Sequence, residues 1–381
     1  MPTATRSHTP RLTLLSLFAA VLALTMGSTS AALASGDAAP AVPMRGINVY
    51  LTGYDATRND QIEGLLDTLA QMHVNTIVLN VPIYIDSVTG SRIEAVPDGS
   101  DQHVHGDTPT PAELQAAIRP AVARGFTVWV RPLLDEAPLI AEGAWRGELQ
   151  PADPAAFFAA YTRTLLGILA GSSGASWFVI GTEFNSLQQD TYAGDWEPLI
   201  DTVRASAAGR SMKLLYALNW DTGGYPQFPS WMDALDGIAV DAYYPLDGLG
   251  NDASSTEVAT AWQSWTSALQ AFRDHFPGKP FFVSEAGIAS QQRDPSAYAA
   301  PASWPGDGQP ADPGLQRTYI EGTCAYLRNA AASDGSRMAS GVAWWMTSIN
   351  PVEHPEQDTT FAIVGKPAQD AVADCFAAWT A

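Results

Sequence analysis

The sequence is poor in cysteine, and this limits the kinds of site it can build. It contains only Cys324 and Cys375, which form neither a CxxC motif nor a Cys/His cluster. Common structural zinc sites and dithiol redox motifs are therefore excluded. In an exported protein an even pair of cysteines favours one disulfide, here between the last two predicted helices. Two free buried thiols are the alternative, and neither interpretation is catalytic.

Basic residues are also scarce. There are 20 Lys and Arg residues against 40 Asp and Glu residues, and the formal net charge is −20 at pH 7. Such a charge repels the phosphate backbone of a nucleic acid. It disfavours polyanionic substrates for the same reason. We therefore expect no nucleic-acid partner.

No apolar run is long enough for a comfortable membrane span. The chain has a basic start, a mostly apolar segment over 12–26 and a small-residue cleavage site ending at Ala34. This pattern predicts a signal peptide over residues 1–34, with an uncleaved N-terminal anchor as the alternative. We expect residues 35–43 to be a flexible lead-in. The mature protein would then be secreted, free of the membrane and monomeric.

The sequence lacks a glycine-rich phosphate-binding turn after its first apolar run, which disfavours a doubly wound nucleotide-binding sheet. Instead, several segments repeat one pattern: a short apolar or β-branched run, a polar residue at its end, and then a helical stretch. These runs cover residues 44–51, 74–81, 126–130, 177–180, 212–218, 237–240, 281–283 and 341–345.

Helical patterns occur between and after these runs. They cover residues 58–72, a segment that begins at Thr110 and Pro111, and residues 154–170 and 367–379. Eight strand–helix units are the number in a (β/α)8 barrel, and no linker divides the chain. We therefore predict an α/β fold, a single-domain TIM barrel over residues 44–381. An open doubly wound sheet is the alternative.

Polar and aromatic residues follow the predicted strands. The carboxyl ends of the strands of such a barrel meet at one rim, where sites are built. Amides and carboxylates bind hydroxyl groups and aromatic rings pack on sugars, so the rim predicts a carbohydrate site. Trp344 and Trp345 point to opposite faces of one strand, so only one of them can face the rim. The candidate residues are Asn48, Asn80, Arg131, Glu183, Asn185, Asn219, Trp220, Asp241, Tyr243, Glu285, Trp344 and Trp345.

Glu183 and Glu285 each end an apolar run that is typical of a strand buried on both faces. Retaining glycoside hydrolysis uses two carboxyl groups, one as nucleophile and one as acid and then base. The two predicted strands face each other across the barrel, so this pair fits that chemistry. Ion pairs with Arg131 or Lys279 are the structural alternative for either Glu. For Asp241 a structural role is the better interpretation.

Two other functions are open at this point. A non-catalytic polysaccharide-binding barrel would keep the aromatic residues but would not need a close pair of carboxylates. A metal-dependent hydrolase would use His103 and His105, but the sequence places no third ligand beside them. We therefore interpret these histidines as polar loop residues. We expect neither a metal nor an organic cofactor.

The chain also resembles glycoside hydrolase family 113, within the large clan of retaining (β/α)8 glycosidases. The motifs that carry the resemblance keep their order and span essentially the whole predicted mature chain. They are Arg45-Gly46-Ile47-Asn48, Trp145-Arg146-Gly147, Gly181-Thr182-Glu183, Tyr216-Ala217-Leu218-Asn219-Trp220, Asp241-Ala242-Tyr243-Tyr244-Pro245-Leu246, Ser284-Glu285-Ala286-Gly287 and Gly365-Lys366-Pro367-Ala368.

The resemblance implies roles for individual residues. Glu183 would be the acid/base and Glu285 the nucleophile. Tyr243 would lie near the nucleophile, and a tryptophan of the last strand would floor the sugar site. The implied substrate is β-1,4-mannan, with another β-glycan as the alternative.

Two positions depart from the pattern. Thr182 precedes the acid/base where the wider clan usually has Asn, although family 113 resembles this chain there. The residues after Glu285 are Ala286, Gly287 and Ile288, where members commonly have a glycine and an aromatic residue. The first departure bears on the contact with the sugar 2-hydroxyl and the second on the identity of the sugar.

Overall fold

The computed structural model describes residues 43–56, 58–94, 107–134, 139, 143–221, 228–306, 308–349 and 352–379. The predicted signal peptide and all of the predicted lead-in except Pro43 lie outside these residues, as do His103 and His105. The elements described below belong to one compact unit, Val42–Ala381. Among the helices of the described ranges, none combines the length and the apolar character that a membrane crossing requires.

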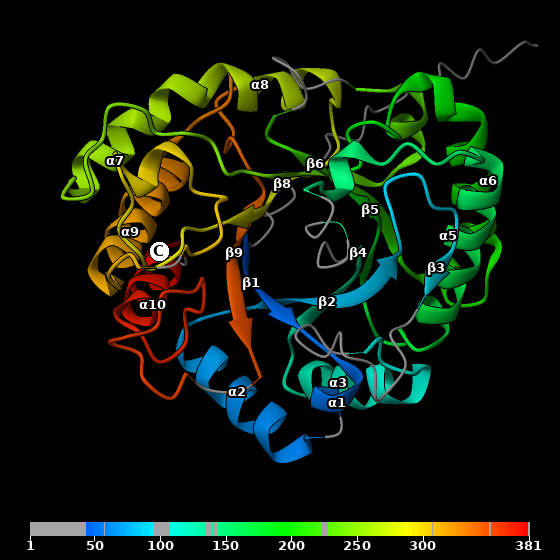
Figure 1. The fold of residues 1–381 in the computed structure, drawn as a ribbon, viewed down its shortest axis with the longest axis horizontal. Helices are drawn as coiled ribbons and strands as arrows, with labels where there is room; N and C mark the ends of the chain where they lie inside the picture. Colours follow the sequence, from blue (N-terminus) through cyan, green and yellow to red (C-terminus); the bar gives the residue numbers. More distant parts are fainter. Residues whose placement is uncertain are drawn as a thin grey trace, which may run out of the picture. The chain divides into compact units, whose positions relative to one another are not determined.

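Parallel strands close into a barrel at the centre of the fold (Figure 1). The hydrogen-bonded order is β1-β9-β8-β7-β6-β5-β4-β2, and β1 pairs with β2 to complete the ring. The short β3 pairs antiparallel with β2 and stays outside the ring. The strands are β1 (Met44–Tyr50), β2 (Thr76–Ile85), β3 (Ile93–Glu94), β4 (Thr127–Leu134), β5 (Trp177–Thr182), β6 (Lys213–Asn219), β7 (Gly237–Asp241), β8 (Phe281–Ala286) and β9 (Gly341–Ser348).

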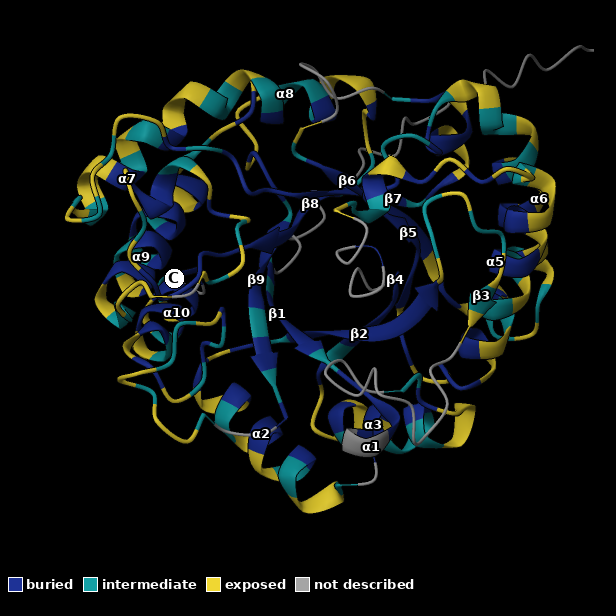
Figure 2. Cartoon of the chain, in the orientation of Figure 1, coloured by how far each residue is buried: buried dark blue, intermediate teal, exposed yellow. Residues whose placement is uncertain are grey.

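Helices surround the barrel and present their exposed residues outward, whereas the barrel strands are buried (Figure 2). The α-helices are α1 (Gly53–Ala56), α2 (Asn59–Gln71), α3 (Pro111–Ala123), α5 (Pro154–Ala170), α6 (Ala193–Ala205), α7 (Ser255–Ala261), α8 (Thr266–His275), α9 (Pro313–Asn329) and α10 (Pro367–Trp379). Short 3-10 helices are η1 (Arg146–Glu148), η2 (Asp190–Tyr192), η3 (Gly209–Ser211), η4 (Ser230–Ala234), η5 (Trp262–Trp265) and η6 (Ala297–Ala299). The prediction of a TIM barrel is confirmed.

Local sequence signals account for several helix starts and for the last helix pair. Thr110 caps α3 through a capping box with Glu113, and Pro111 occupies the first turn, as predicted. Asp153 caps α5 by accepting a hydrogen bond from the backbone N–H of Ala156. Cys324 on α9 and Cys375 on α10 form the predicted disulfide, which links positions 51 residues apart.

Alternation along the strands separates two apolar layers. Inward-facing residues fill the barrel and form a floor beneath the polar rim. Trp129 lies at its centre, with its ring centroid 5.5 Å from that of Trp177 and 4.9 Å from that of Phe282. Outward-facing residues pack against the helices in the larger core. The inner layer comprises Met44, Val78, Trp129, Trp177, Val179, Leu215, Ala217, Ala239, Phe282 and Ala343.

Candidate active site

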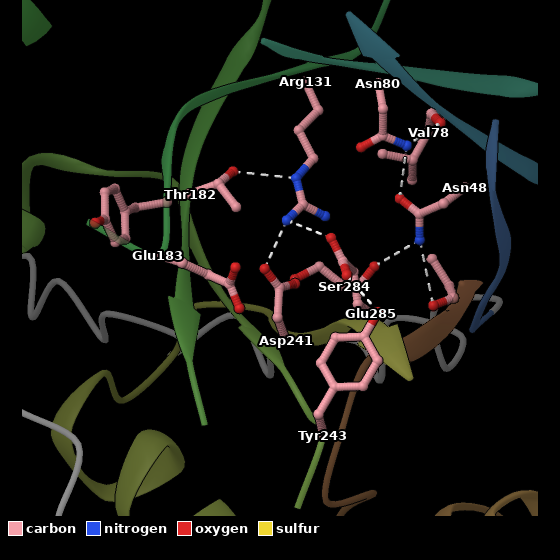
Figure 3. A network of polar contacts seen from close by, with 12 residues as sticks. Asn48, Val78, Asn80, Arg131, Thr182, Glu183, Asp241, Tyr243, Ser284 and Glu285 are labelled. Carbon is pink, nitrogen blue, oxygen red and sulfur yellow. Dashed lines mark hydrogen bonds and ion pairs between the residues drawn. The ribbon is translucent and has the colours of Figure 1, made fainter. Parts of the chain in front are cut away.

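A buried charge network lies directly above this apolar floor. Arg131, from β4, places Nη2 2.5 Å from Oδ2 of Asp241 and 2.6 Å from Oε1 of Glu285. Its Nε donates a hydrogen bond of 3.1 Å to Oγ1 of Thr182. Figure 3 shows the guanidinium between the ends of β5, β7 and β8. One cation thus ties three strand ends together.

Glu285 is held at both carboxylate oxygens. Oε1 meets Arg131, and Oε2 accepts a hydrogen bond of 2.6 Å from the hydroxyl group of Tyr243. The neighbouring Ser284 donates a hydrogen bond of 2.8 Å to Oδ1 of Asp241. Since charge-assisted bonds of this kind are short and strong, they restrict the Glu285 side chain to one position.

An irregularity in β8 brings both Ser284 and Glu285 into the barrel. Phe282 faces inward and Val283 outward, so strict alternation would turn Ser284 in and Glu285 out. The register with β9 shifts between Val283 and Ala286, and the two intervening residues both contact the charge network. A β-bulge re-aims side chains in this way.

Two buried amides brace the bulge from below. Nδ2 of Asn48 donates to the backbone oxygens of Ser284 at 2.9 Å and Trp344 at 3.3 Å. Nδ2 of Asn80 in turn donates to Oδ1 of Asn48 at 3.1 Å. Because an unpaired buried carbonyl is costly, these bonds stabilise the irregular end of β8.

A second irregularity precedes Glu183 at the end of β5. Ile180 packs outward, and a Cβ at Gly181 would lie 2.6 Å from the Tyr216 ring, which belongs to the same outer layer. Two successive residues thus face outward, and Thr182 turns inward to Arg131. Only glycine fits beside the Tyr216 ring, which explains the residue at position 181.

Glu183 follows with a left-handed backbone, φ 55°, which non-glycine residues seldom adopt. Its N–H donates to the backbone oxygen of Ala217 at 2.9 Å. Its Oε2 lies 3.0 Å from Nη1 of Arg146, which comes from the short helix η1. Ser186 donates to the Gly147 oxygen through both its N–H and its hydroxyl, so η1 is attached to the segment that carries Glu183.

Burial and neighbouring charges shape the protonation of this network. Burial raises the pKa of Glu285 from 4.5 to about 7; Arg131 and Tyr243 lower it, and Asp241 adds to the rise. Burial also raises the pKa of Asp241, against the opposing effect of Arg131. Burial lowers the pKa of Arg131, but the carboxylates of Asp241, Glu285 and Glu183 raise it by a larger amount. The net pKa of Arg131 is therefore raised, and the guanidinium stays charged.

Tyr243 keeps its proton under all ordinary conditions. Burial and the charge of Glu285 raise the pKa of the Tyr243 hydroxyl well above 10. The hydroxyl is therefore a permanent donor to Glu285, and it favours the ionised carboxylate.

Apolar rings form one wall above the charged residues. The cluster consists of Leu133, Tyr243, Ala289, Trp345 and Phe361, with Tyr50, Trp220 and Met346 packed against it. A flat apolar wall beside carboxylates suits a sugar ring, whose faces are apolar and whose edges carry hydroxyls. Trp345 is the tryptophan of β9 that belongs to this wall.

Five of the candidate rim residues are completely buried, so in this structure they support the site from within the protein. They are Asn48, Asn80, Arg131, Asp241 and Trp344, each 0% exposed. The two amides brace β8, and Arg131 and Asp241 orient Glu285. Trp344 packs in the outer core between strands and helices. A side chain without exposed surface cannot touch a ligand unless the barrel rearranges.

The other predicted residues reach the surface of the site. Glu183 is 9% exposed and Glu285 4% exposed, and Asn219, Tyr243 and Trp345 are similarly accessible. Nδ2 of Asn185 donates to the backbone oxygen of Asp221 at 2.8 Å, and Oδ1 of Asn219 accepts from the Asp221 N–H at 3.1 Å. These two amides therefore also shape the segment after β6.

Sequence reasoning assigned no role to Arg146 or Phe361, which the structure brings to the site. Arg146 lies within one of the family motifs, and this was the available signal for it. Phe361 comes from the segment between β9 and α10 and has no local pattern that distinguishes it. Within the described ranges, no group of three or more His, Cys, Asp or Glu residues is arranged to hold a metal ion.

The comparisons with known proteins agree with this architecture. The model of Glycoside Hydrolase Family 113 matches residues 52–366. A search of curated proteins found no match.

Solved structures with the same fold include two β-mannanases of that family. The β-mannanase AaManA from Alicyclobacillus acidocaldarius is 21% identical, with a TM-score of 0.69 over 88% of this chain and 98% of that chain. A second family 113 β-1,4-mannanase is 16% identical, with a TM-score of 0.69 over 88% and 99%. A family 5 mannosidase from Rhizomucor miehei is 12% identical, with a TM-score of 0.52 over 89% and 93%.

Proposed function

This chain belongs to glycoside hydrolase family 113, and from that membership we propose that it is an exported, retaining hydrolase of β-1,4-mannan. Glu285 is the nucleophile and Glu183 the acid/base. One observation carries the assignment: Glu183, just past the end of β5, and Glu285, on β8, lie at the same barrel mouth, and both carboxylates raise the pKa of Arg131.

The proposed reaction has two steps. Glu285 attacks the anomeric carbon while the bond to the leaving oxygen breaks, and Glu183 gives that oxygen its proton. Water then attacks the glycosyl–enzyme ester, Glu183 takes the proton of the water, and the Glu285 carboxylate is released. Arg131 and Tyr243 hold Glu285 in line for the attack and stabilise its charge as it leaves the sugar.

The choice of mannan is supported by the solved family 113 structures, which are of β-mannanases. Assay against β-1,4-mannan, β-1,4-glucan, β-1,4-xylan and β-1,4-galactan, with reducing ends measured, tests it. We expect mannan to be cleaved fastest, with proton NMR of the first products showing the retained β-anomer. Rapid cleavage of another polymer would overturn the choice of sugar, and an inverted product would overturn the mechanism.

Export is supported by the N-terminal pattern of residues 1–34. The mature protein then begins after Ala34 and consists of the lead-in and the barrel domain, 44–381. Expression in a host that processes such peptides, followed by N-terminal sequencing of the protein in the medium, tests this. We expect a start at Ser35 and a monomer in size-exclusion chromatography. Retention of an intact N-terminus in the membrane fraction would contradict it.

A further inference from the structure

Trp304 is unusual for a large apolar side chain in this protein. It is 52% exposed, and among the described residues only Val122, at 40%, is another exposed large hydrophobic residue. Exposing an indole to water forfeits the free energy that its burial would contribute. Single exposed apolar side chains are common, so the case for a ligand surface rests on what Trp304 contacts.

A line of ring contacts connects Trp304 to the catalytic carboxylate. The centroid of its ring lies 5.4 Å from that of Phe361, at 78° between planes. Phe361 lies 6.4 Å from Tyr243, at 80°. The hydroxyl of Tyr243 then donates to Glu285 at 2.6 Å. Trp304 thus extends the aromatic wall outward from Glu285.

The loop that carries Trp304 is anchored near this residue. The buried side chain of Gln291 binds Gly306 on both sides: Nε2 donates to its oxygen at 2.7 Å and Oε1 accepts from its N–H at 2.8 Å. Arg293 donates to the backbone oxygen of Trp304. Gln291 also pairs with Ala311 in an isolated bridge. The ring is therefore presented by a braced backbone, which lowers the entropy cost of binding.

The position of the loop indicates which part of the substrate the ring meets. The loop leaves β8, and in Figure 1 it lies across the barrel from β5, whose end Glu183 directly follows. The leaving sugar must lie on the Glu183 side, because Glu183 protonates its oxygen. The sugars that stay attached to the reacting unit then extend in the other direction, towards Phe361 and Trp304.

We propose that Trp304 is a stacking platform for a sugar at least one unit beyond the reacting one, on the non-reducing side of the cleaved bond. This inference rests on the proposed function and adds the preference for long chains. The platform binds a distant part of the chain and does not touch the reacting atoms, so it acts on KM and on the cleavage position.

The test uses β-1,4-mannooligosaccharides of two to six sugars, labelled at the reducing end. For Trp304→Ala we expect KM to rise about tenfold for the longest chains, the scale of one aromatic contact, with kcat nearly unchanged. The shortest cleaved chain should show no change. Cleavage should also shift towards the non-reducing end, because complexes with a long non-reducing part are weakened.

Trp304→Tyr keeps a ring and should restore most of the affinity. Val122→Ala, on α3, is the matched control for loss of an exposed apolar side chain and should behave as wild type. Equal KM changes at every chain length, or no change, would overturn the platform alone if the wild-type protein cleaves these substrates. A wild-type protein that leaves all of them intact would overturn both the choice of mannan and the platform.

Discussion

The two proposed catalytic carboxylates are held in different ways. Glu285 lies within β8 and contacts Arg131 and Tyr243, which come from β4 and the segment after β7. Glu183 lies just past the end of β5, in a left-handed conformation, and meets Arg146 from a short 3-10 helix. Glu183 is also the more exposed of the two, at 9% against 4%.

This difference matches the two tasks. A nucleophile must be charged and aimed at one atom, so bonds from rigid strands suit it. An acid/base must give a proton to a sugar oxygen and later take one from water, so access to solvent suits it. Barrel strands hold Glu285, and the segments after the strands hold Glu183. A single fold can therefore provide both a fixed nucleophile and an accessible acid/base.

The largest effect should come from Glu285→Ala. Without the nucleophile, kcat on mannan should fall by about 10⁴-fold or more. Glu94→Ala, which removes an exposed carboxylate on β3, is the control and should keep full activity. Added azide should restore turnover of an activated aryl glycoside and give the α-linked azide. Full activity of Glu285→Ala would refute the assignment.

Glu183→Ala should cost less and should depend on the leaving group. Loss of general acid catalysis should lower kcat/KM on mannan by about 10²–10⁴-fold. The loss should be much smaller for an aryl glycoside whose leaving group needs no proton. Azide should then give the β-linked product. An equal loss on both substrates would mean that Glu183 does not protonate the leaving group.

Arg131→Met should lower the stability of the protein, because Arg131 belongs to the strand-borne network around Glu285. It leaves Asp241 and Glu285 buried without their cation, which should lower the unfolding free energy by about 3–5 kcal/mol. Arg204→Met breaks the partly exposed pair with Asp236 and should cost less than about 1 kcal/mol. Chemical denaturation measures both. Similar small losses would show that the buried network does not stabilise the barrel mouth.

Tyr243→Phe should have the smallest effect, and it is visible in the pH profile. Glu285 reacts as the anion, so its raised pKa predicts that kcat/KM falls as pH drops through about 7. The Tyr243 hydroxyl lowers that pKa, so its removal should move the acidic limb to higher pH, by up to about one unit. At pH values well above the shifted limb the variant should approach wild type. A shift to lower pH would contradict the role of this bond.

The stability of the protein should follow the same titration with the opposite sign. Because the folded pKa of Glu285 lies above 4.5, the folded protein binds more protons than the unfolded chain between about pH 4.5 and 7. The contribution of this group to stability therefore decreases as pH rises through that window. Ionisation of Glu285 therefore raises activity and lowers the stability of the folded protein over the same pH range.

The sequence allowed the barrel and both glutamates to be predicted because these depend on local signals. Apolar runs, caps and strand-end polar residues are readable one segment at a time, and each predicted run overlaps a barrel strand. It did not reveal that Asn48 and Asn80 lie below the surface of the site. Their depth depends on the register of β1 against β2, which no local pattern specifies.

The alternation of side chains along a strand did not predict which way the residues of the site face at the end of β8. It separated Trp344 from Trp345 correctly, because the irregularity of β9 against β1 comes only after Trp344. It could not place Ser284 and Glu285 on the same face, because a bulge changes the count by one residue. Asn48, from another strand, stabilises the bulge by donating a hydrogen bond to the backbone oxygen of Ser284.

By itself the sequence determined that this protein is a barrel with a glutamate after the fourth and another near the end of the seventh barrel strand, since hydrophobic periodicity and strand order are properties of the chain. Only the tertiary structure decided how those glutamates differ. The partners of Glu285 and Glu183, namely Arg131, Tyr243 and Arg146, lie 37 or more residues away along the chain. The charged neighbours of each glutamate, its burial and the direction of its side chain depend on which strands become neighbours when the barrel closes.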